Sequence, residues 1–243
     1  MRKYNLFKTK KETNRPDVCL SLSLKNTADL YDEISKYGDK CQIIEWCVDG
    51  FEGAENFSKE EFIEKAKLVK SFIKPRKMLV DYKGDEVIQN RIIRWAMGIA
   101  DIVDIDFGNP QIDRLVREAK RKDTKVLVSH HEFERMPEKN EIAELYIRME
   151  KTGGDILKIA AMSKNEEETY RILEGAAAYK QLKHSKDIVA IAMGEEGQVS
   201  RICAGDFGSV ISYARGSVPT APGQIECDKL SKYMDTYYSE EEE

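Results

Sequence analysis

The sequence contains no apolar run that is long enough to cross a membrane. A membrane-spanning helix needs about 18 or more consecutive apolar residues, and no segment of the 243-residue sequence approaches that length. Residues 1–8, MRKYNLFK, also lack the apolar core of a secretory signal peptide. We therefore expect a cytoplasmic protein without a membrane partner.

Cysteine is scarce, and no two cysteines are spaced as a C-x-x-C pair. Zinc sites and redox motifs usually use such pairs, and disulfide frameworks use even numbers of cysteines. The pattern therefore indicates reduced thiols and no metal site. The five cysteines are Cys19, Cys41, Cys47, Cys203 and Cys227.

An excess of positive charge is also missing. The formal net charge is -5 at pH 7, the sequence pI is near 5.5, and both signs are mixed along the chain. Because nucleic-acid-binding proteins usually carry a basic stripe, we expect no nucleic acid partner. A small anionic substrate is compatible with this composition, since a local cluster of cations can lie within an acidic protein.

No low-complexity linker and no repeat beyond a strand-helix alternation divides the chain. With 41% hydrophobic residues, it can bury one large core. We predict a single domain over residues 1–243, with a polar N-terminal lead-in at 1–16 and an acidic C-terminal tail at 239–243. We expect neither end to carry function.

Eight short β-branched or apolar runs alternate with helical patterns. Eight strand-helix units in about 250 residues favour a closed (β/α)8 TIM barrel, although an open doubly wound sheet would show the same alternation. The predicted strands are 18–24, 41–48, 77–82, 102–106, 125–129, 155–160, 187–192 and 209–214. The clearest predicted helices are 58–73, 85–98, 111–122, 140–152 and 165–179, several of them with Ser, Asp or Asn as the N-cap.

Polar residues gather where several of these strands end. Active sites of (β/α)8 barrels lie at the carboxyl ends of the strands, so these residues are candidates for a shared site. They are residues 45–49 (EWCVD), 81–83 (DYK), 129–132 (SHHE), Lys158 and 193–194 (MG). An ordinary solvated loop would explain any one of them, but does not explain so many at once.

Lys158 lies in residues 154–162, GDILKIAAM, which otherwise read as a buried strand. An ammonium group in such a setting is exposed, paired or chemically used. Burial disfavours the charged form, so we expect a lowered pKa and an amine that can attack a carbonyl group as a Schiff-base nucleophile. A snorkelling or salt-bridged lysine is the structural alternative.

Two of the three histidines are adjacent, at the end of the fifth predicted strand. Consecutive strand residues point to opposite faces, so only one of them can face the barrel interior. His131 shares a face with Ser129 and Leu127, whereas His130 shares the other face with Val128. A histidine beside a Schiff-base lysine can serve as general acid and base.

The loops near the carboxyl end carry Arg201 and residues 219–224, PTAPGQ. An arginine with nearby hydroxyl and amide donors can hold a planar carboxylate bidentately. Alternatively, Arg201 is a surface ion pair and the Ala-Pro-Gly turn only ends a strand.

These motifs, in this order, resemble the type I 3-dehydroquinate dehydratase family of the shikimate pathway, from about residue 18 to 230. Residues 45–49 are similar to the family's Glu-Trp-Arg-x-Asp, and residues 129–133 (SHHEF) to its Ser-x-His-Asp-Phe. Residues 155–160 (DILKIA) resemble its Schiff-base strand. Residues 200–201 with 207–209, and residues 221–224 (APGQ), resemble its two closing motifs.

The resemblance implies a lyase in aromatic amino acid biosynthesis that converts 3-dehydroquinate, a small anionic hydroxy keto acid, to 3-dehydroshikimate without cofactor or metal. It implies Lys158 as the imine nucleophile and His131 as general acid and base. An acidic residue orients the histidine in the family. Here Asp85 and Glu86 are the candidates, and we favour Glu86. We further predict substrate-binding roles for Glu45, Lys83, Arg201, Thr220, Gln224 and Ser21, and a possible homodimer.

Two departures from the family pattern concern substrate binding. Cys47 stands where the family has arginine, and residues 81–83 (DYK) stand where it usually has Thr-x-Arg. Lysine keeps the charge but loses the planar fork of donors, and cysteine keeps neither. The sequence therefore leaves open a paralogue that uses its Schiff-base lysine on another keto acid, and a non-catalytic barrel that only binds a ligand.

Overall fold

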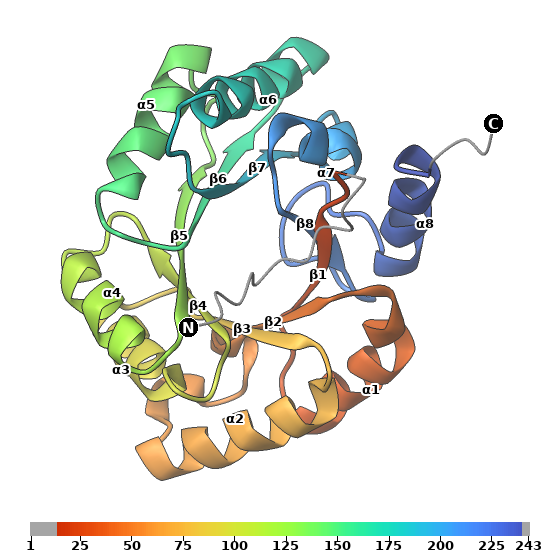
Figure 1. The fold of residues 1–243 in the computed structure, drawn as a ribbon. Helices are drawn as coiled ribbons and strands as arrows, with labels where there is room; N and C mark the ends of the chain where they lie inside the picture. Colours follow the sequence, from red (N-terminus) through yellow and green to blue (C-terminus); the bar gives the residue numbers. More distant parts are fainter. Residues whose placement is uncertain (1–13, 240–243) are drawn as a thin grey trace.

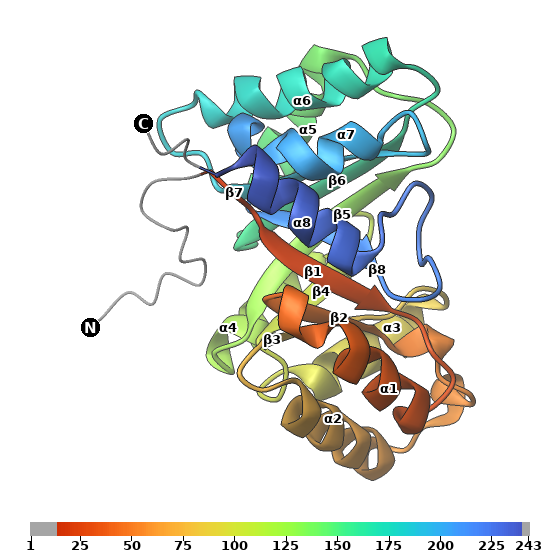
Figure 2. The same ribbon diagram turned by 90° about the vertical axis from the view of Figure 1, so that its right-hand side faces the viewer.

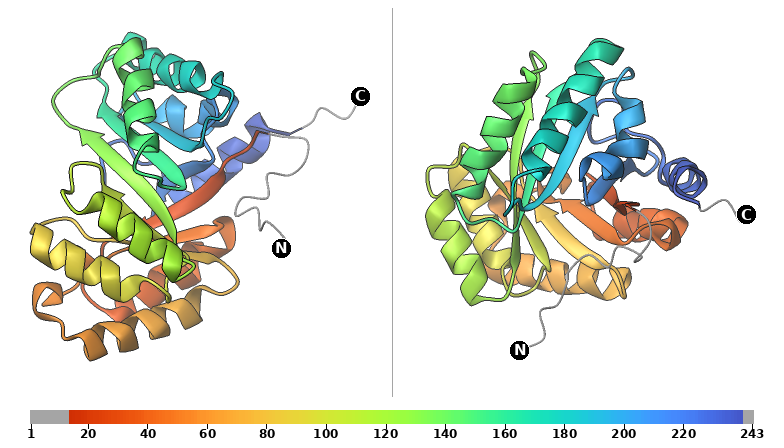
Figure 3. Two further views of the ribbon diagram at one scale, coloured as in Figure 1. Left: turned by 60° about the vertical axis from the view of Figure 1, so that its left-hand side comes forward. Right: turned by 45° about the horizontal axis from the view of Figure 1, so that its top comes forward.

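The structure is a computed structural model, and it describes residues 14–239. Most of the predicted lead-in and tail, residues 1–13 and 240–243, lies outside the described residues. Within them, strands and helices alternate along the chain, and the helices surround a central ring of strands (Figure 1). Figure 3 shows the same arrangement from two other sides. No helix among residues 14–239 is long and apolar enough to cross a membrane.

All of the strand pairs are parallel, in the order β7-β6-β5-β4-β3-β2-β1-β8. β1 pairs with both β2 and β8, and the N–H of Val210, directly before β8, donates to the Ile188 carbonyl of β7, so the sheet is nearly closed. This confirms the (β/α)8 barrel over the open sheet. The strands are β1 (Asp17–Leu22), β2 (Ile43–Cys47), β3 (Lys77–Asp81), β4 (Ile102–Asp106), β5 (Lys125–Glu132), β6 (Ile156–Met162), β7 (Asp187–Met193) and β8 (Ile211–Arg215).

Eight α-helices lie within the described part of the chain. The predicted N-caps Ser58, Asp85 and Asn165 accept hydrogen bonds from the first helical turn. Asn140 as the N-cap is wrong, because the N-cap is Glu138, two residues earlier, which forms a capping box with Glu141. The helices are α1 (Thr27–Tyr37), α2 (Lys59–Ile73), α3 (Glu86–Ala96), α4 (Ile112–Arg121), α5 (Lys139–Glu150), α6 (Glu166–Lys180), α7 (Gln198–Cys203) and α8 (Cys227–Tyr237).

Most predicted strands differ from the structure by one to three residues at one or both ends, and the largest extension is that of β5. β5 continues to Glu132 rather than Ser129 because its ladder with β6 continues through the His131↔Ala160 pair. β6 likewise continues to Met162. β8 begins at Ile211 rather than at residue 209, because the Ser209 hydroxyl accepts a hydrogen bond from the Ala190 N–H instead of extending the strand.

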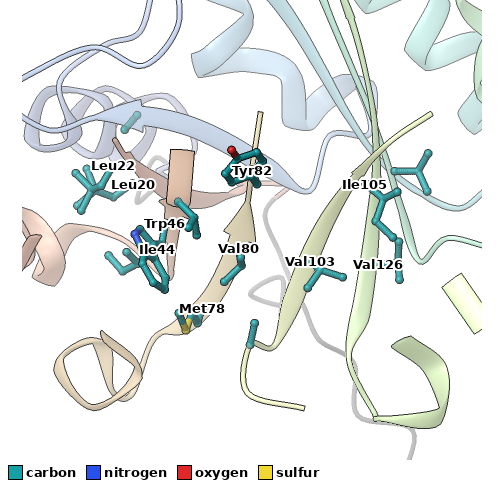
Figure 4. Packing of buried hydrophobic residues seen from close by; sticks show 14 of the residues in the cluster. Leu20, Leu22, Ile44, Trp46, Met78, Val80, Tyr82, Val103, Ile105 and Val126 are labelled. Atoms are coloured by element: carbon teal, nitrogen blue, oxygen red, sulfur yellow. The ribbon is translucent and has the colours of Figure 1, made fainter. Parts of the chain in front are cut away.

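The barrel has two apolar layers. Between strands and helices lie outward-facing side chains such as Ile44, Trp46 and Val80, which Figure 4 shows. Trp46 stacks on Phe62 of α2, with ring centroids 5.7 Å apart. A separate cluster that includes Leu127 and Ile156 fills the lumen. Strand side chains alternate between these two layers. At the carboxyl ends of the strands, the side chains on the lumen side therefore face the opening of the barrel, where active sites of this fold lie.

Candidate active site

The site lies at the carboxyl ends of the strands, on the side where the β8–α8 loop emerges beside the tip of β1 (Figure 2). A small cavity of about 30 Å³ there is lined by Lys158, His131, Glu45 and Arg201 together with Lys83 and other residues. An adjoining cavity of about 390 Å³ shares His131 and Lys83 with it. The remaining lining residues of the small cavity are Ser21, Ala160, Ile191, Met193, Tyr213, Thr220, Ala221 and Gln224.

Lys158 extends from the middle of β6 into the lumen and is 4% exposed. Its Nζ donates a hydrogen bond to Asp104 Oδ2 at 2.8 Å and lies 4.7 Å from the centre of the Tyr213 ring. Burial alone would lower the pKa of Lys158, but the negative charges of Asp104, Glu45 and Asp81 outweigh burial and raise it above its usual value. The predicted lowering of this pKa is therefore wrong. The resting lysine is an ammonium ion.

Asp104 is the counter-ion of Lys158 and lies in β4, two strands away. Burial would raise its pKa, but the Lys158 ammonium, its hydrogen bond and that of Ser129 lower the pKa below the usual value. The site analysis of the sequence missed Asp104. A signal was present, since residues 102–106 read IVDID and place Asp104 on the same face as Ile102, which lies in the lumen cluster.

His131 faces the cavities, as strand alternation from Leu127 requires. Burial, followed by the positive charges of Lys158 and Lys83, lowers its pKa to about 3. The imidazole is therefore neutral at physiological pH and has a free ring nitrogen that can accept a proton. Its ring stacks on Phe133 at a centroid distance of 6.0 Å.

The sequence analysis named Asp85 and Glu86 as candidates for the acidic residue that orients the histidine, and the two side chains have different contacts. Asp85 is the N-cap of α3, and its carboxylate accepts hydrogen bonds from the Val87 and Ile88 N–H groups. Glu86 lines the larger cavity with His131, and Asn90 Nδ2 donates to its Oε1 at 3.3 Å. Among the hydrogen bonds of residues 14–239, none joins Glu86 to His131 directly.

Arg201 lies in the short helix α7 and is 2% exposed. Its guanidinium donates to the main-chain carbonyls of Tyr213, Pro222 and Gly223, at 2.9 to 3.2 Å. No acidic side chain of the described residues lies within ion-pair distance of it. Burial alone lowers its pKa to about 10, so it is cationic at neutral pH without a protein counter-ion.

The β8–α8 loop is tied across the opening by polar side chains. The Thr220 hydroxyl lies 2.8 Å from that of Ser21 in β1. Gln224 Oε1 accepts hydrogen bonds from the Thr220 and Ala221 N–H groups, at 2.7 and 3.1 Å. Ser21, Thr220 and Gln224 are thus brought together with Arg201 at one side of the small cavity.

Cys47 ends β2, the strand next to Ser21, and Lys83 follows β3. The Cys47 thiol is 3.6 Å from the Ser21 hydroxyl and 3.7 Å from Glu45 Oε2. Burial, followed by the charges of Glu45 and Asp81, holds the pKa of Cys47 well above its usual value, so it remains a thiol. Lys83 Nζ lies 3.8 Å from Asp81 Oδ2.

Glu45, Asp81 and Asp104 form an acidic cluster, in which one carboxylate oxygen from each lies within 4.8 Å of the others. Carboxylate oxygens are suitable ligands for hard cations. Here the Lys158 ammonium already contacts Asp104, and Lys83 lies beside Asp81. The cations that meet this cluster are therefore the two lysines.

The geometry defines a (β/α)8 barrel with a buried lysine, a neutral histidine and an arginine that has no acidic partner among residues 14–239, around one cavity at the carboxyl ends of its strands. The model of the family described as type I 3-dehydroquinase matches residues 18–241. The chain belongs to this family.

Individual relatives agree with the family model. The 3-dehydroquinate dehydratase of Clostridioides difficile (strain 630) is 31% identical over 234 residues, which cover 90% of this chain and 91% of the relative. That of Listeria monocytogenes serotype 4a (strain HCC23) is 26% identical over 239 residues, which cover 93% and 94%.

Solved structures show the same fold. A type I 3-dehydroquinate dehydratase from Clostridium difficile, solved with covalently modified comenic acid, has a TM-score of 0.84 at 28% identity and covers 92% of each chain. A 3-dehydroquinate dehydratase from Geobacillus kaustophilus has a TM-score of 0.85 at 21% identity, covering 97% of this chain and all of that one, and supports the fold alone.

Proposed function

We propose that the protein is a 3-dehydroquinate dehydratase that acts through a covalent imine at Lys158. The observation that carries this proposal is the pairing of a buried amine and a neutral imidazole on the adjacent strands β5 and β6, facing one cavity. A protein that only binds a ligand has no need for an imine nucleophile beside a general base. Family membership and the related dehydratases supply the substrate.

The first step removes a proton from the Lys158 ammonium. Asp104, 2.8 Å away, is the group placed to accept it. The free amine attacks the substrate ketone, the amine proton passes to the carbinol oxygen, and Asp104 returns its proton as that oxygen leaves as water. The product is a protonated imine, which is an electron sink for the neighbouring carbon.

His131 then acts as base and acid. Its neutral imidazole takes a proton from the carbon next to the imine and afterwards delivers it to the departing hydroxyl, which leaves as water. Hydrolysis of the conjugated imine releases 3-dehydroshikimate and restores Lys158. Glu86 orients His131 in this scheme, from its place in the shared cavity.

Charge divides the substrate contacts into two sets. Arg201, which has no protein counter-ion among residues 14–239, receives the substrate carboxylate. Thr220 and Gln224 are placed beside it. Glu45 meets the substrate hydroxyls on the acidic side, Ser21 lies between Glu45 and Thr220, and Lys83 lies at the entrance to the larger cavity.

The test is a steady-state assay with 3-dehydroquinate that follows the conjugated product, for the wild type and for Lys158→Met. Turnover in the wild type alone is expected. Borohydride reduction in the presence of substrate, followed by peptide mass spectrometry, should mark Lys158. A label on Lys83 or Lys164 instead would contradict the assignment.

A second candidate function is supported by Cys47 and Asp81, which change the charge of the pocket relative to the family pattern. A paralogue that forms the same imine with a different keto acid would show borohydride labelling of Lys158 with that acid but no turnover of 3-dehydroquinate. The two candidates are therefore separated by the same pair of measurements.

A further inference from the structure

Three carboxyl groups from neighbouring strands meet at one side of the active site. Glu45 of β2, Asp81 of β3 and Asp104 of β4 are each at most 4% exposed. One oxygen of each lies within 4.8 Å of the others. An ionised carboxylate only accepts hydrogen bonds, and a protonated carboxyl group still has acceptor capacity, so this side of the pocket can accept hydrogen bonds from a ligand.

The three carboxyl groups differ in the donors that they already have. Asp104 accepts from Lys158 at 2.8 Å, and Glu45 accepts a hydrogen bond from the Ser21 hydroxyl. The Asp81 carboxyl group accepts no hydrogen bond from any residue between 14 and 239. Its contact is the Lys83 ammonium at 3.8 Å, and the Lys83 side chain is half exposed. Asp81 is thus the buried acceptor with unused capacity.

The opposite side of the pocket has the reverse charge. The buried Arg201 guanidinium has main-chain carbonyls as its hydrogen-bond partners and no carboxylate among the described residues. A ligand that satisfies both sides therefore carries an anionic group at one end and hydrogen-bond donors at the other.

We propose that Asp81 is a specificity-determining residue, which accepts hydrogen bonds together with Glu45 from the end of the substrate remote from its carboxylate. That end carries hydroxyl or ammonium donors and no second anionic group. This inference rests on the proposed function, and it extends that function from one compound to a class of substrate.

Charge balance supports the exclusion of a second anion. If every group is ionised, the cluster and its two lysines have a net charge of -1. The three carboxylates are those of Glu45, Asp81 and Asp104, and the two ammonium groups are those of Lys83 and Lys158. Burial, followed by the charges of Asp104 and Glu45, holds the pKa of Asp81 well above its usual value, so the charge of the two neighbours disfavours a third negative charge at this place. A phosphate or second carboxylate would meet this repulsion, whereas an ammonium ion would relieve it.

Position makes Asp81 accessible to a ligand. It lines the larger cavity of about 390 Å³ together with His131 and Lys83, while Glu45 lines the small cavity that contains Lys158. The small cavity, at about 30 Å³, has room for roughly one water molecule. A bound keto acid must therefore extend toward the larger cavity, and Asp81 lies on the boundary between the two.

The experiment compares kcat/KM for three compounds: 3-dehydroquinate, its analogue with an amine in place of the C5 hydroxyl, and its C5 methyl ether. The enzymes are the wild type, Asp81→Asn, Asp81→Thr and the control Asp106→Asn. Asp106 lines the same larger cavity and loses the same charge, but it lies outside the acidic cluster. Folding of each variant is checked by thermal unfolding.

We expect the wild type to use the amine analogue at least as well as 3-dehydroquinate and to use the methyl ether poorly. In Asp81→Asn and Asp81→Thr the ratio of kcat/KM for the amine analogue to that for 3-dehydroquinate should fall about tenfold or more, the change that 1.4 kcal/mol represents. Asp106→Asn should leave this ratio unchanged.

If 3-dehydroquinate is turned over, the inference is wrong when the ratio of kcat/KM for the amine analogue to that for 3-dehydroquinate is unchanged in both Asp81 variants. It is also wrong when Asp106→Asn lowers this ratio as much as the Asp81 variants do. Equal use of the methyl ether by the wild type also contradicts it, because an ether donates no hydrogen bond. No turnover of 3-dehydroquinate by the wild type contradicts the proposed function itself.

Discussion

The Nζ atom of Lys158 and the carboxylate of Asp104 form a buried ion pair across the lumen, at 2.8 Å, although β5 separates their strands. Both side chains are at least 95% buried. Such a pair keeps the lysine protonated and fixes its position, so the proposed imine mechanism requires that a proton first moves within the pair.

Removing Asp104 should therefore affect stability and chemistry together. We expect Asp104→Asn to destabilise the fold by about 3 kcal/mol, the lower end for a broken buried pair, because Glu45 and Asp81 still face Lys158. Urea unfolding measures this change. The double variant Asp104→Asn with Lys158→Met should regain part of the lost stability, since no unpaired charge is left. Equal stability of the single and double variants would contradict the ion-pair interpretation.

The two adjacent histidines should differ in their effect on turnover. We expect His131→Ala to lower kcat by roughly 10²–10⁴-fold, the usual contribution of general acid and base catalysis, because only His131 faces the cavities. His130→Ala is the matched control on the other face of β5, and it should cost less. Steady-state kinetics with 3-dehydroquinate decides, and a larger loss in His130→Ala would rule out the assignment.

The pKa of His131 also predicts how stability depends on pH. The folded imidazole titrates at about 3, whereas the unfolded one titrates near 6.5. Between these values the unfolded state binds more protons, so this group contributes stability above pH 6.5 that is lost as pH falls toward 3, by at most about 1.4 kcal/mol per pH unit. In His131→Gln, the loss of stability between pH 7 and about pH 4.5 should be smaller than in the wild type, as measured by urea unfolding.

Cys47 and Lys83 mark the places where the pocket departs from the family pattern. If 3-dehydroquinate is the substrate, Cys47→Arg should maintain or raise kcat/KM, because it restores a charge-assisted contact of about 1.5–3 kcal/mol. The new guanidinium would lie beside Glu45 and Asp81, so it need not be buried without a partner. Lys83→Arg and the double variant complete the series. Absence of 3-dehydroquinate turnover in the wild type and all three variants would favour the paralogue.

The barrel and the place of its site could be predicted from the sequence because both depend on periodicity. Alternation between strands and helices gives the closed sheet, and alternation within β5 assigns opposite faces to His130 and His131. Residue type also predicted the N-caps Ser58 and Asp85. Their side-chain oxygens accept hydrogen bonds from N–H groups of the first helical turn.

The electrostatics could not be predicted in the same way, because they depend on residues that are distant in sequence. Burial of Lys158 was correctly expected, but the direction of its pKa shift follows from Asp104, 54 residues away. For the same reason, Arg201 reads as a free carboxylate clamp in the sequence, whereas the structure shows three of its hydrogen bonds going to main-chain carbonyls.

The contact between Ser21 and Thr220 spans 199 residues and joins the first strand to the last loop of the barrel. Arg201 depends on the same loop, since it donates to the Pro222 and Gly223 carbonyls. The anion-binding side of the site therefore exists only when the last loop of the barrel is seated against the first strand, so the two ends of the fold jointly form one half of the pocket.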